Sequence, residues 1–262
     1  MRAIVLTSNG LRHKYFLKVI SENFDLVGAV YEDKGEYYKK QVEKSSVVVE
    51  HFKRLGSTEK DFFQDEVQNL SLKNLEIKNL NKNQINDENI ITWAKDLKPD
   101  IIFLFGTGIL KDGWLDDFEN KIINLHLGLS PFYRGSATLF WPFVTDELEC
   151  VGTTIHIAAK KVDAGGILHR VKPNIGVDDN YYTINYKTIK STIDILPKIA
   201  TKFIQGEIDL IKQDISNSKV YKKSDFNENV LTSVLDKYKY KDSISVDIVN
   251  KIEESQKCIC CQ

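Results

Sequence analysis

The stretch DIIFLF, Asp100–Phe105, is an unbroken run of five apolar residues after one acidic residue. Short, continuous apolar runs are typical of strands that are buried on both faces, as the central strands of parallel sheets are. The Gly-containing segment GTGILKDGW, residues 106–114, follows at once and predicts a loop. A buried strand with a Gly-rich loop at its carboxyl end indicates an α/β protein.

The beginning of the chain predicts a parallel βαβ unit. Arg2–Ser8 is a β-branched apolar run that leads into Ser-Asn-Gly, Leu11–Asn23 carries apolar residues at helical spacing, and Asp25–Glu32 is again strand-like. A strand, a Gly-containing turn, a helix and a second strand in this order are typical of a parallel sheet with crossover helices.

The remaining elements are predicted from the same patterns. The charged segment Lys39–Leu80 is predicted to be helical, with a helix cap at Ser57 or Thr58. Pro197 is expected to kink or divide a long helix. The other expected elements are a helix over Asn86–Leu97, strands over Lys121–Leu127 and Cys150–Ala159, a helix over Asp179–Gln205, a strand and turn over Lys219–Phe226, and a short helix over Asn227–Asp236.

Length and charge limit the class of protein. The chain has 262 residues, of which 42% are hydrophobic, so it can bury a large core without disulfides. We expect a Rossmann-like α/β domain with a mostly parallel sheet over residues 1–205 and a small C-terminal extension over residues 206–262. The formal net charge is −1 and only five residues are Arg, so the composition favours neither a nucleic-acid nor a membrane partner.

Cysteine usage and apolar runs bear on the compartment. Three of the four cysteines crowd the end of the chain, as Cys258, Cys260 and Cys261, with no His beside them to complete a metal site. We expect a loose, reduced tail there. The N-terminal apolar run is too short for a signal peptide, and no stretch approaches the roughly 20 apolar residues that span a bilayer. A cytoplasmic protein is therefore predicted.

Three polar side chains are predicted to meet at the carboxyl edge of the sheet, where open parallel sheets bind their ligands. Asn124 and His126 stand two apart in an expected strand, so they point to the same side of it, and Asp163 lies in the Gly turn VDAGG. Such a trio suits acyl transfer to an amine, since His can take up a proton, Asn can donate a hydrogen bond to an oxyanion, and Asp can orient or relay. No Ser or Cys nucleophile is evident, so direct transfer is the simpler hypothesis.

Each signal also has a structural interpretation. A single Asn or His on a strand is more often a satisfied polar group of the core than a catalyst, and Asp163 could be a turn former. His156, in the run TTIHI, is interpreted as a structural strand residue. The turn before the first helix could bind a phosphate or sugar through backbone N–H groups, and a plain surface turn explains it equally well. Its candidate contacts are Ser8, Asn9, Gly10, Arg12 and His13.

Three motifs together resemble the folate-dependent formyltransferase family, which is marked by Asn-x-His, then Pro-x-x-Arg-Gly, then Asp-x-Gly. Here the motifs are Asn124–Leu125–His126, Pro131–Phe132–Tyr133–Arg134–Gly135 and Asp163–Ala164–Gly165. The resemblance covers about Arg2 to Val171. Many members have Pro-Ser directly after the His, where this chain has Leu127–Gly128; this difference bears on the subfamily more than on the chemistry.

The resemblance implies that 10-formyltetrahydrofolate is the formyl donor, that no metal takes part, and that Asn124, His126 and Asp163 are catalytic. It also implies that backbone groups of two loops hold the pterin, and the absence of side chains at Gly106 and Gly108 would let the backbone approach a flat ring. The implied donor-binding residues are Phe105, Gly106, Thr107, Gly108, Ile109, Leu110, Ala159 and Val162.

The acceptor is predicted from charge and length. Members of the family formylate methionyl-tRNA, glycinamide ribonucleotide or sugar nucleotides. Residues 181–262 hold 13 Lys, no Arg and 11 acidic residues, a weak excess for an enzyme that would grip tRNA phosphates. This region is also short for the C-terminal barrel that the resemblance implies for tRNA enzymes, and TSNGLRH matches the phosphate loop of the purine enzymes only in part.

The predicted acceptor is therefore the amine of a nucleotide-linked amino-deoxysugar for surface polysaccharide, with Arg134 as a further substrate contact. A homodimer is compatible with such an enzyme. The tRNA and ribonucleotide enzymes stay as alternatives, and an inactive folate-binding relative is the non-enzymatic one.

Overall fold

The computed structural model describes residues 1–33, 45–72, 75–176, 178–216 and 218–238. The strands are β1 (Arg2–Thr7), β2 (Asp25–Glu32), β3 (Ile77–Leu80), β4 (Ile101–Leu104), β5 (Ile122–His126), β6 (Tyr133–Gly135), β7 (Thr153–Ile157), β8 (Ile167–Val171) and β9 (Lys219–Tyr221). The α-helices are α1 (Leu11–Asn23), α3 (Ser46–Val67), α4 (Glu88–Asp96), α5 (Asp112–Asp117), α6 (Trp141–Thr145), α7 (Tyr181–Ile204) and α8 (Glu228–Tyr238). Short 3-10 turns occur at η1 (Gln84–Asn86), η2 (Leu148–Cys150) and η3 (Lys223–Asp225).

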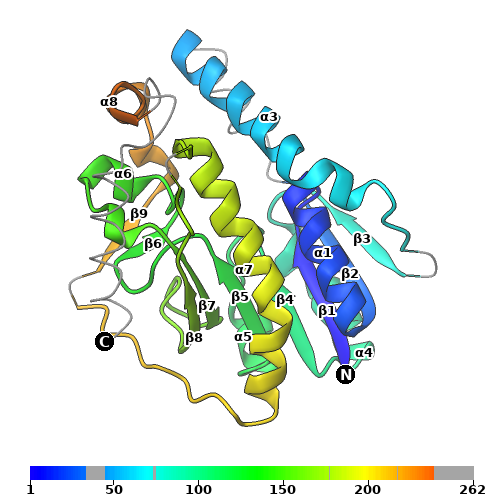
Figure 1. The fold of residues 1–262 in the computed structure, drawn as a ribbon. Coiled ribbons are helices and arrows are strands. Elements are labelled where there is room, and N and C mark those ends of the chain that lie inside the picture. The colour runs from blue at the N-terminus through cyan, green and yellow to red at the C-terminus, as the bar shows by residue number, and fades with distance from the viewer. Residues whose placement is uncertain (34–44, 73–74, 177, 217, 239–262) are drawn as a thin grey trace.

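A seven-stranded sheet in the order β3-β2-β1-β4-β5-β7-β8 organises the described residues (Figure 1). The five strands from β3 to β5 in this order run parallel, whereas β7 and β8 are antiparallel to their neighbours. The predicted βαβ opening and the mostly parallel sheet are thus confirmed. The carboxyl ends of β1, β2, β4 and β5 lie along one edge of the sheet, and the loops that follow them gather there.

Helices cover both faces of the sheet and bury two separate apolar cores. Side chains of α1, α3 and α7 pack into one core, and those of α4 and α5 pack into the other. In Figure 1, the ribbons of α1 and α7 lie in front of the sheet. In β1, Ala3 and Val5 enter the first core while Ile4 and Leu6 enter the second. Because side chains alternate along a strand, a strand between two helical layers needs an apolar residue at every position. This requirement explains the unbroken apolar run of β4.

The element that the sequence patterns miss is β3. The segment 39–80 was expected to be helical throughout, but its described part contains α3 and then the strand β3, which pairs with β2 at the sheet edge. β3 has four residues, and none of them is fully buried, so no apolar run marks it. Ser57 and Thr58 lie inside α3, so the predicted cap there is wrong. Residues 39–44 fall outside the described part.

α7 is a single helix that continues through Pro197, so Pro197 does not divide it, and a kink at Pro197 stays a prediction. Asn180 caps its N-terminus, where the side-chain oxygen accepts the backbone N–H groups of Tyr182 and Thr183. No helix among the described residues is long and apolar enough to cross a membrane.

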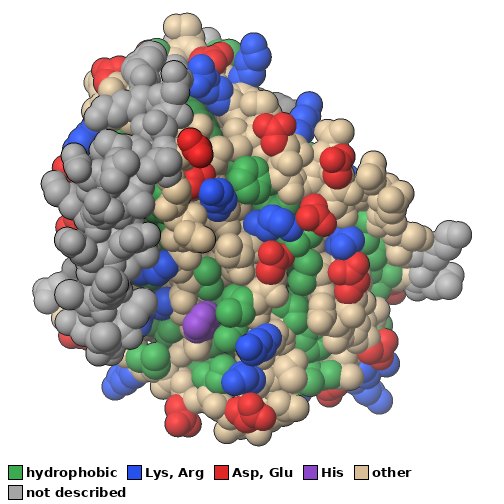
Figure 2. Space-filling model, in the orientation of Figure 1, with side chains coloured by type: hydrophobic (Ala, Val, Ile, Leu, Met, Phe, Trp, Pro, Cys, Tyr) green, Lys and Arg blue, Asp and Glu red, His purple; other side chains and the backbone are tan. Residues whose placement is uncertain are grey.

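The chain after α7 turns back onto the sheet. Ile211 forms a two-way backbone bridge with Ile167 of β8, and β9 pairs in parallel with β6. Whether residues 206–262 form a unit of their own stays a prediction, and Cys258, Cys260 and Cys261 lie outside the described residues. On the face shown in Figure 2, basic and acidic side chains are intermingled.

Candidate active site

β5 and β7 bring two polar side chains face to face. Their antiparallel register places Asn124 opposite His156 and His126 opposite Thr154. Side chains that lie directly opposite each other are close enough to contact. The Nδ2 atom of Asn124 lies 3.1 Å from Nε2 of His156. His156 is therefore part of the polar cluster, although it occupies a strand position in the core.

The cluster converges on Asp163, in the turn between β7 and β8. Its Oδ1 lies 3.4 Å from Nδ2 of Asn124, 3.4 Å from Nδ1 of His126 and 3.7 Å from Nε2 of His156. The side chains of His126, His156 and Asp163 are 6%, 1% and 12% exposed. The structure thus brings together the three residues predicted to be catalytic and adds a fourth.

The turn that carries Asp163 has a constrained backbone. Asp163 has a φ of +49°, in the left-handed region that non-Gly residues rarely adopt. Its Oδ2 accepts the backbone N–H of Gly135 at 2.9 Å. Two residues on, a Cβ at Gly165 would lie 1.8 Å from the carbonyl oxygen of Ile157, so only Gly fits. This close approach accounts for the Gly of the Asp-x-Gly motif.

Arg134 ties this turn to the rest of the protein. Its Nε and Nη2 donate to the carbonyl of Val162 at 2.8 and 2.6 Å, and its Nη1 donates to Oγ of Ser218 at 2.8 Å. The Arg side chain is buried, at 6% exposure. The guanidinium therefore supports the loop next to Asp163, and its predicted contact with the acceptor stays a prediction.

Electrostatics keep the imidazole neutral and the carboxyl charged near neutral pH. Burial lowers the pKa of His126, against the opposing attraction of Asp163, while His156 and Arg134 add to the lowering. For Asp163, burial acts to raise the pKa, but His126, His156 and the Gly135 N–H outweigh it and bring the pKa to about 2. The site thus combines a proton acceptor with a fixed negative charge.

Hydrogen-bond partners assign the protons on the two imidazoles. Nε2 of His126 lies 2.8 Å from the carbonyl oxygen of Tyr133, which can only accept, so Nε2 carries the proton and Nδ1 has the free lone pair. In the same way, Nδ1 of His156 donates to the carbonyl of Ile157 at 2.8 Å, which leaves Nε2 to accept from Asn124. One N–H of Asn124 is therefore committed to His156, and within the described part of the chain the other makes only the long contact to Asp163.

The loop after β4, which the resemblance assigns to the donor, is held by a buried carboxylate. Glu32, 3% exposed, accepts the backbone N–H groups of Gly108 at 2.6 Å and Asn83 at 2.9 Å. Gly106 has a φ of +73°, which a residue with a side chain would adopt only with strain. Asn86 donates to the carbonyl of Ile109 at 3.0 Å. The loop is therefore fixed in shape by its neighbours.

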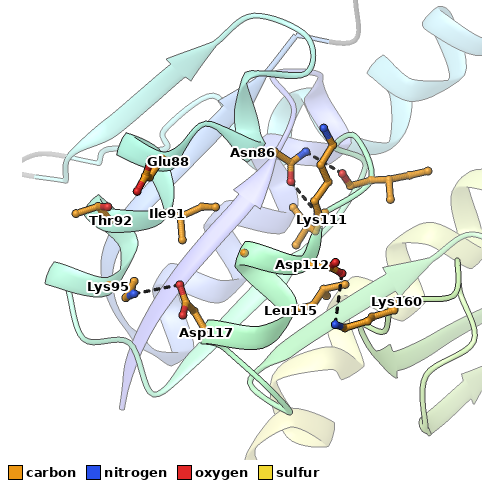
Figure 3. A pocket seen from close by; sticks show the side chains of 13 residues that line it. Asn86, Glu88, Ile91, Thr92, Lys95, Lys111, Asp112, Leu115, Asp117 and Lys160 are labelled. Atoms are coloured by element: carbon orange, nitrogen blue, oxygen red, sulfur yellow. Dashed lines mark hydrogen bonds and ion pairs between the residues drawn. The ribbon is translucent and has the colours of Figure 1, made fainter.

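A cavity of about 780 Å³ lies beside this loop, between α4 and α5 (Figure 3). Ile109 and Leu110 of the loop line it, together with Lys160 from the loop before Asp163. Nζ of Lys160 is 2.9 Å from a carboxylate oxygen of Asp116 in α5. The catalytic candidates do not line this cavity, so it adjoins the predicted site through two shared loops and does not contain it.

At the first turn, the side chains of Arg12 and His13 contact other residues of the protein. Nη1 of Arg12 lies 3.0 Å from Oε1 of Glu59, which also accepts the backbone N–H of Arg12 at 3.0 Å. His13 is 1% exposed and packs edge-on against Phe105, with ring centroids 4.7 Å apart. Ser8 is buried as well, whereas Asn9 is exposed. A phosphate or sugar contact at this turn stays a prediction.

Three supporting residues escape the sequence patterns: His156, Glu32 and Gln213. His156 follows the strand pattern, and its partner Asn124 becomes visible only through the β5–β7 register. The sequence did contain a signal, because β7, TTIHI, is buried at every position and a fully buried His in such a strand is unusual. Glu32 and Gln213 act on backbone groups far away in the sequence, and such contacts leave no local pattern.

The sheet with two helical layers and the polar cluster at its carboxyl edge define a Rossmann-like protein with a candidate acyl-transfer site. The chain belongs to the formyl transferase family, which matches residues 14–200. Over 132 residues it is 33% identical to the methionyl-tRNA formyltransferase of Halalkalibacterium halodurans, a match that covers 50% of this chain and 41% of that protein. The chain therefore spans less than half the length of this curated relative.

Two solved structures share the fold. The formyltransferase PseJ from Anoxybacillus kamchatkensis, in complex with UDP-4,6-dideoxy-4-formamido-L-AltNAc and tetrahydrofolate, is 19% identical, with a TM-score of 0.51 over 96% of this chain and 97% of that one. Phosphoribosylglycinamide formyltransferase from Anaplasma phagocytophilum is 16% identical, with a TM-score of 0.57 over 82% of this chain and 96% of that one. At these identities the likeness concerns the fold alone.

Proposed function

We propose that this protein transfers a formyl group from 10-formyltetrahydrofolate to the amine of a nucleotide-linked amino-deoxysugar. The observation that carries the proposal is the convergence of Asn124, His126 and Asp163, with 3.4 Å between Asp163 Oδ1 and each of the other two side chains. Membership of the formyl transferase family supports the same reaction class. A role in surface polysaccharide synthesis in the cytoplasm is the corresponding expectation.

The proton chemistry follows from the assigned tautomers. Nδ1 of His126 is the free lone pair, so it is the atom that takes the proton from the attacking amine. The imidazolium formed there lies beside the carboxylate of Asp163, which stabilises it. The second N–H of Asn124, 3.4 Å from Asp163 Oδ1, is the donor available to the oxyanion that develops on the formyl oxygen. When the tetrahedral intermediate collapses, the bond between the formyl carbon and the folate nitrogen breaks, and that nitrogen takes the proton from the His126 imidazolium and leaves as tetrahydrofolate.

The residues around the site fit a folate donor, which supplies an activated formyl group on nitrogen. The loop 105–110 is fixed by Glu32 and contains Gly106 in a left-handed conformation, so its backbone can lie flat against a ring. The cavity beside it has a volume in the range of small-molecule sites, roughly 300–1,000 Å³. Ile109 and Leu110 give it apolar walls, which suit the aromatic part of a folate remote from the formyl group.

The acceptor is assigned on charge. Phosphate contacts dominate affinity for tRNA, so an enzyme of that class needs a broad basic surface. This chain has a net charge of −1, and basic and acidic side chains are intermingled on the face shown in Figure 2. A nucleoside diphosphate needs only a few N–H groups and cations. PseJ, which was solved with a UDP-linked formamido sugar, shows that the shared fold can accommodate this acceptor class, but phosphoribosylglycinamide formyltransferase shares the fold too, so charge and not fold carries the choice.

A competition assay tests the assignment. Purified protein and 10-formyltetrahydrofolate are offered UDP-, dTDP- and GDP-linked amino sugars, glycinamide ribonucleotide and charged initiator tRNA, and the formamide product is measured by mass spectrometry. We expect at least one sugar nucleotide to be formylated with the highest kcat/KM. Formylation of tRNA or the ribonucleotide alone would refute the acceptor, and folate binding without any transfer would identify an inactive relative.

A further inference from the structure

The segment that follows α7 crosses over the turn that carries Asp163. Nε2 of Gln213 donates to the carbonyl of Asp163 at 3.1 Å and to the carbonyl of Gly165 at 2.6 Å. These partners lie 50 and 48 residues earlier in the chain. One side chain from the C-terminal part of the protein therefore holds both ends of the Asp163–Gly165 turn.

The orientation of the Gln213 amide is fixed by chemistry. Both partners are carbonyl oxygens, which only accept, so the NH₂ group and not the oxygen must face the turn. Among the described residues, Oε1 of Gln213 is buried and has no hydrogen-bond partner. Two residues earlier, Ile211 is anchored to Ile167 by reciprocal backbone hydrogen bonds of 2.9 Å. The backbone that presents Gln213 is thus tied to β8, directly after the turn.

A second connection runs from the same segment to the other side of the turn. Ser218 accepts a hydrogen bond from Nη1 of Arg134, whose Nε and Nη2 hold the carbonyl of Val162. Gln213 therefore secures the carbonyls of residues 163 and 165, and Arg134, which Ser218 binds, secures the carbonyl of residue 162. Asp163 needs such support because its left-handed backbone, at φ +49°, is disfavoured for a residue with a side chain.

We infer that Gln213 is a positioning residue for the reaction, which holds the Asp163 turn so that its carboxylate stays beside His126. The expected effect on formyl transfer rests on the proposed function. The effect of Gln213 on the position of the Asp163 carboxylate rests on the geometry of the turn alone. The segment after α7 is then part of the catalytic apparatus, because the sheet alone supplies Asn124, His126 and His156 but leaves the Asp163 turn without two of its supports. Misplacement of a reacting group by about 1 Å can reduce the rate on the order of 100-fold.

The test compares full-length Gln213→Ala and Gln213→Asn with Gln205→Ala, a matched control at an exposed position at the end of α7. The first measurement is the kcat and KM of formyl transfer. We expect kcat to fall about 10- to 100-fold in Gln213→Ala, less in Gln213→Asn, and not in the control, with KM for the acceptor nearly unchanged. The shorter Asn variant keeps an amide and decides the matter if the Ala variant does not fold.

The second measurement does not need turnover: an NMR titration of the His126 ring. The charged or titratable groups that face this ring are Asp163, His156 and Arg134; of these three, Asp163 alone raises the pKa of His126, and the backbone carbonyl of Tyr133 raises it as well. If the turn drifts away in the Gln213 variants, the pKa of His126 falls below its wild-type value. A wild-type titration together with a kcat within twofold of wild type would overturn the inference. If the wild-type protein transfers no formyl group to any acceptor but the Gln213 variants still shift the pKa of His126, the inference stands and the proposed function is wrong.

Discussion

The carboxyl end of β5 and the turn before α1 are both predicted to contact the reactants, and the structure treats them differently. At the carboxyl end of β5, the side chains of Asn124 and His126, together with His156 from the neighbouring β7, point toward the carboxylate of Asp163. At the first turn, the cation of Arg12 is paired with Glu59, and His13 is packed against Phe105. Strand register can aim several side chains at one point, whereas a cation on a helix is readily paired by a carboxylate of the helix beside it.

The largest expected effect tests the β5 side of this comparison. Asn124→Ala, His126→Ala and Asp163→Ala should each reduce kcat about 100-fold or more, because each removes a group that acts on the transition state. Steady-state kinetics and thermal unfolding check this. His169→Ala and Asp209→Ala are controls at less buried positions. Near wild-type rates in all three variants would end the formyltransferase assignment.

The charge of Asp163 should be visible in the pH dependence of stability. Its pKa is about 2 in the folded protein against 3.8 for the free side chain, so the unfolded state binds the proton first as pH falls. The carboxylate therefore contributes its full stabilisation, about 2 kcal/mol, above about pH 4 and loses it as pH falls toward 2. Denaturant unfolding from pH 5 to pH 2 checks this.

Asp163→Asn provides the comparison for this pH effect, since it cannot ionise. We expect its free energy of unfolding to change less with pH in this interval than that of the wild type. Equal slopes for the two proteins would contradict the low pKa of Asp163.

The pH dependence of activity should report His126. Its lowered pKa places the acid limb of the kcat/KM profile below pH 6.5, the ordinary pKa of His.

A smaller effect is expected at His156, which touches Asn124 from the neighbouring strand. His156→Phe keeps a ring of similar size but removes the acceptor at Nε2, so the Asn124 amide loses its fixed orientation. We expect kcat to fall about tenfold with little change in KM. His169→Phe on β8 is the matched control. If His156→Phe lowers kcat as much in an Asn124→Ala background as in the wild type, the two residues act independently and this role is wrong.

The smallest expected effect tests the first turn. Arg12→Ala breaks a partly buried ion pair between α1 and α3, so it should lower the free energy of unfolding by about 1 kcal/mol and leave the KM of the acceptor unchanged. Lys14→Ala, at an exposed position of the same helix, is the control. A large increase in KM with no loss of stability would restore the predicted substrate contact of Arg12.

The strands predicted well from the sequence are those that helices cover on both faces of the sheet. β4 and the middle of β1, Ala3–Leu6, are apolar at every position, and α1 has a regular apolar stripe, so local patterns are enough. β3 fails because an edge strand of four residues is only half-buried and has no such constraint. Ser57 and Thr58 look like a cap but lie inside a helix that the packing of α3 against α1 and α7 stabilises.

The same contrast holds within the candidate site. Asn124 and His126 can be found because they stand two apart in a strand, and Asp163 can be found because it opens a Gly turn, so both signals are local in the sequence. His156 cannot be assigned in this way, since its contact depends on which strands pair and in which register. Glu32 and Gln213 bind backbone groups, which every residue possesses, so the identity of their partners carries no sequence signal.

The long sequence separation between the Asp163 turn and its supports also has a consequence for synthesis on the ribosome. The chain emerges from its N-terminus, and the contacts of β1, α1, β2 and β4 can form before the last third has been made. Gln213 and Ser218 reach the turn only after α7 has been translated. The nascent protein would therefore acquire its sheet early and its organised Asp163 turn late, which separates the onset of folding from the onset of activity.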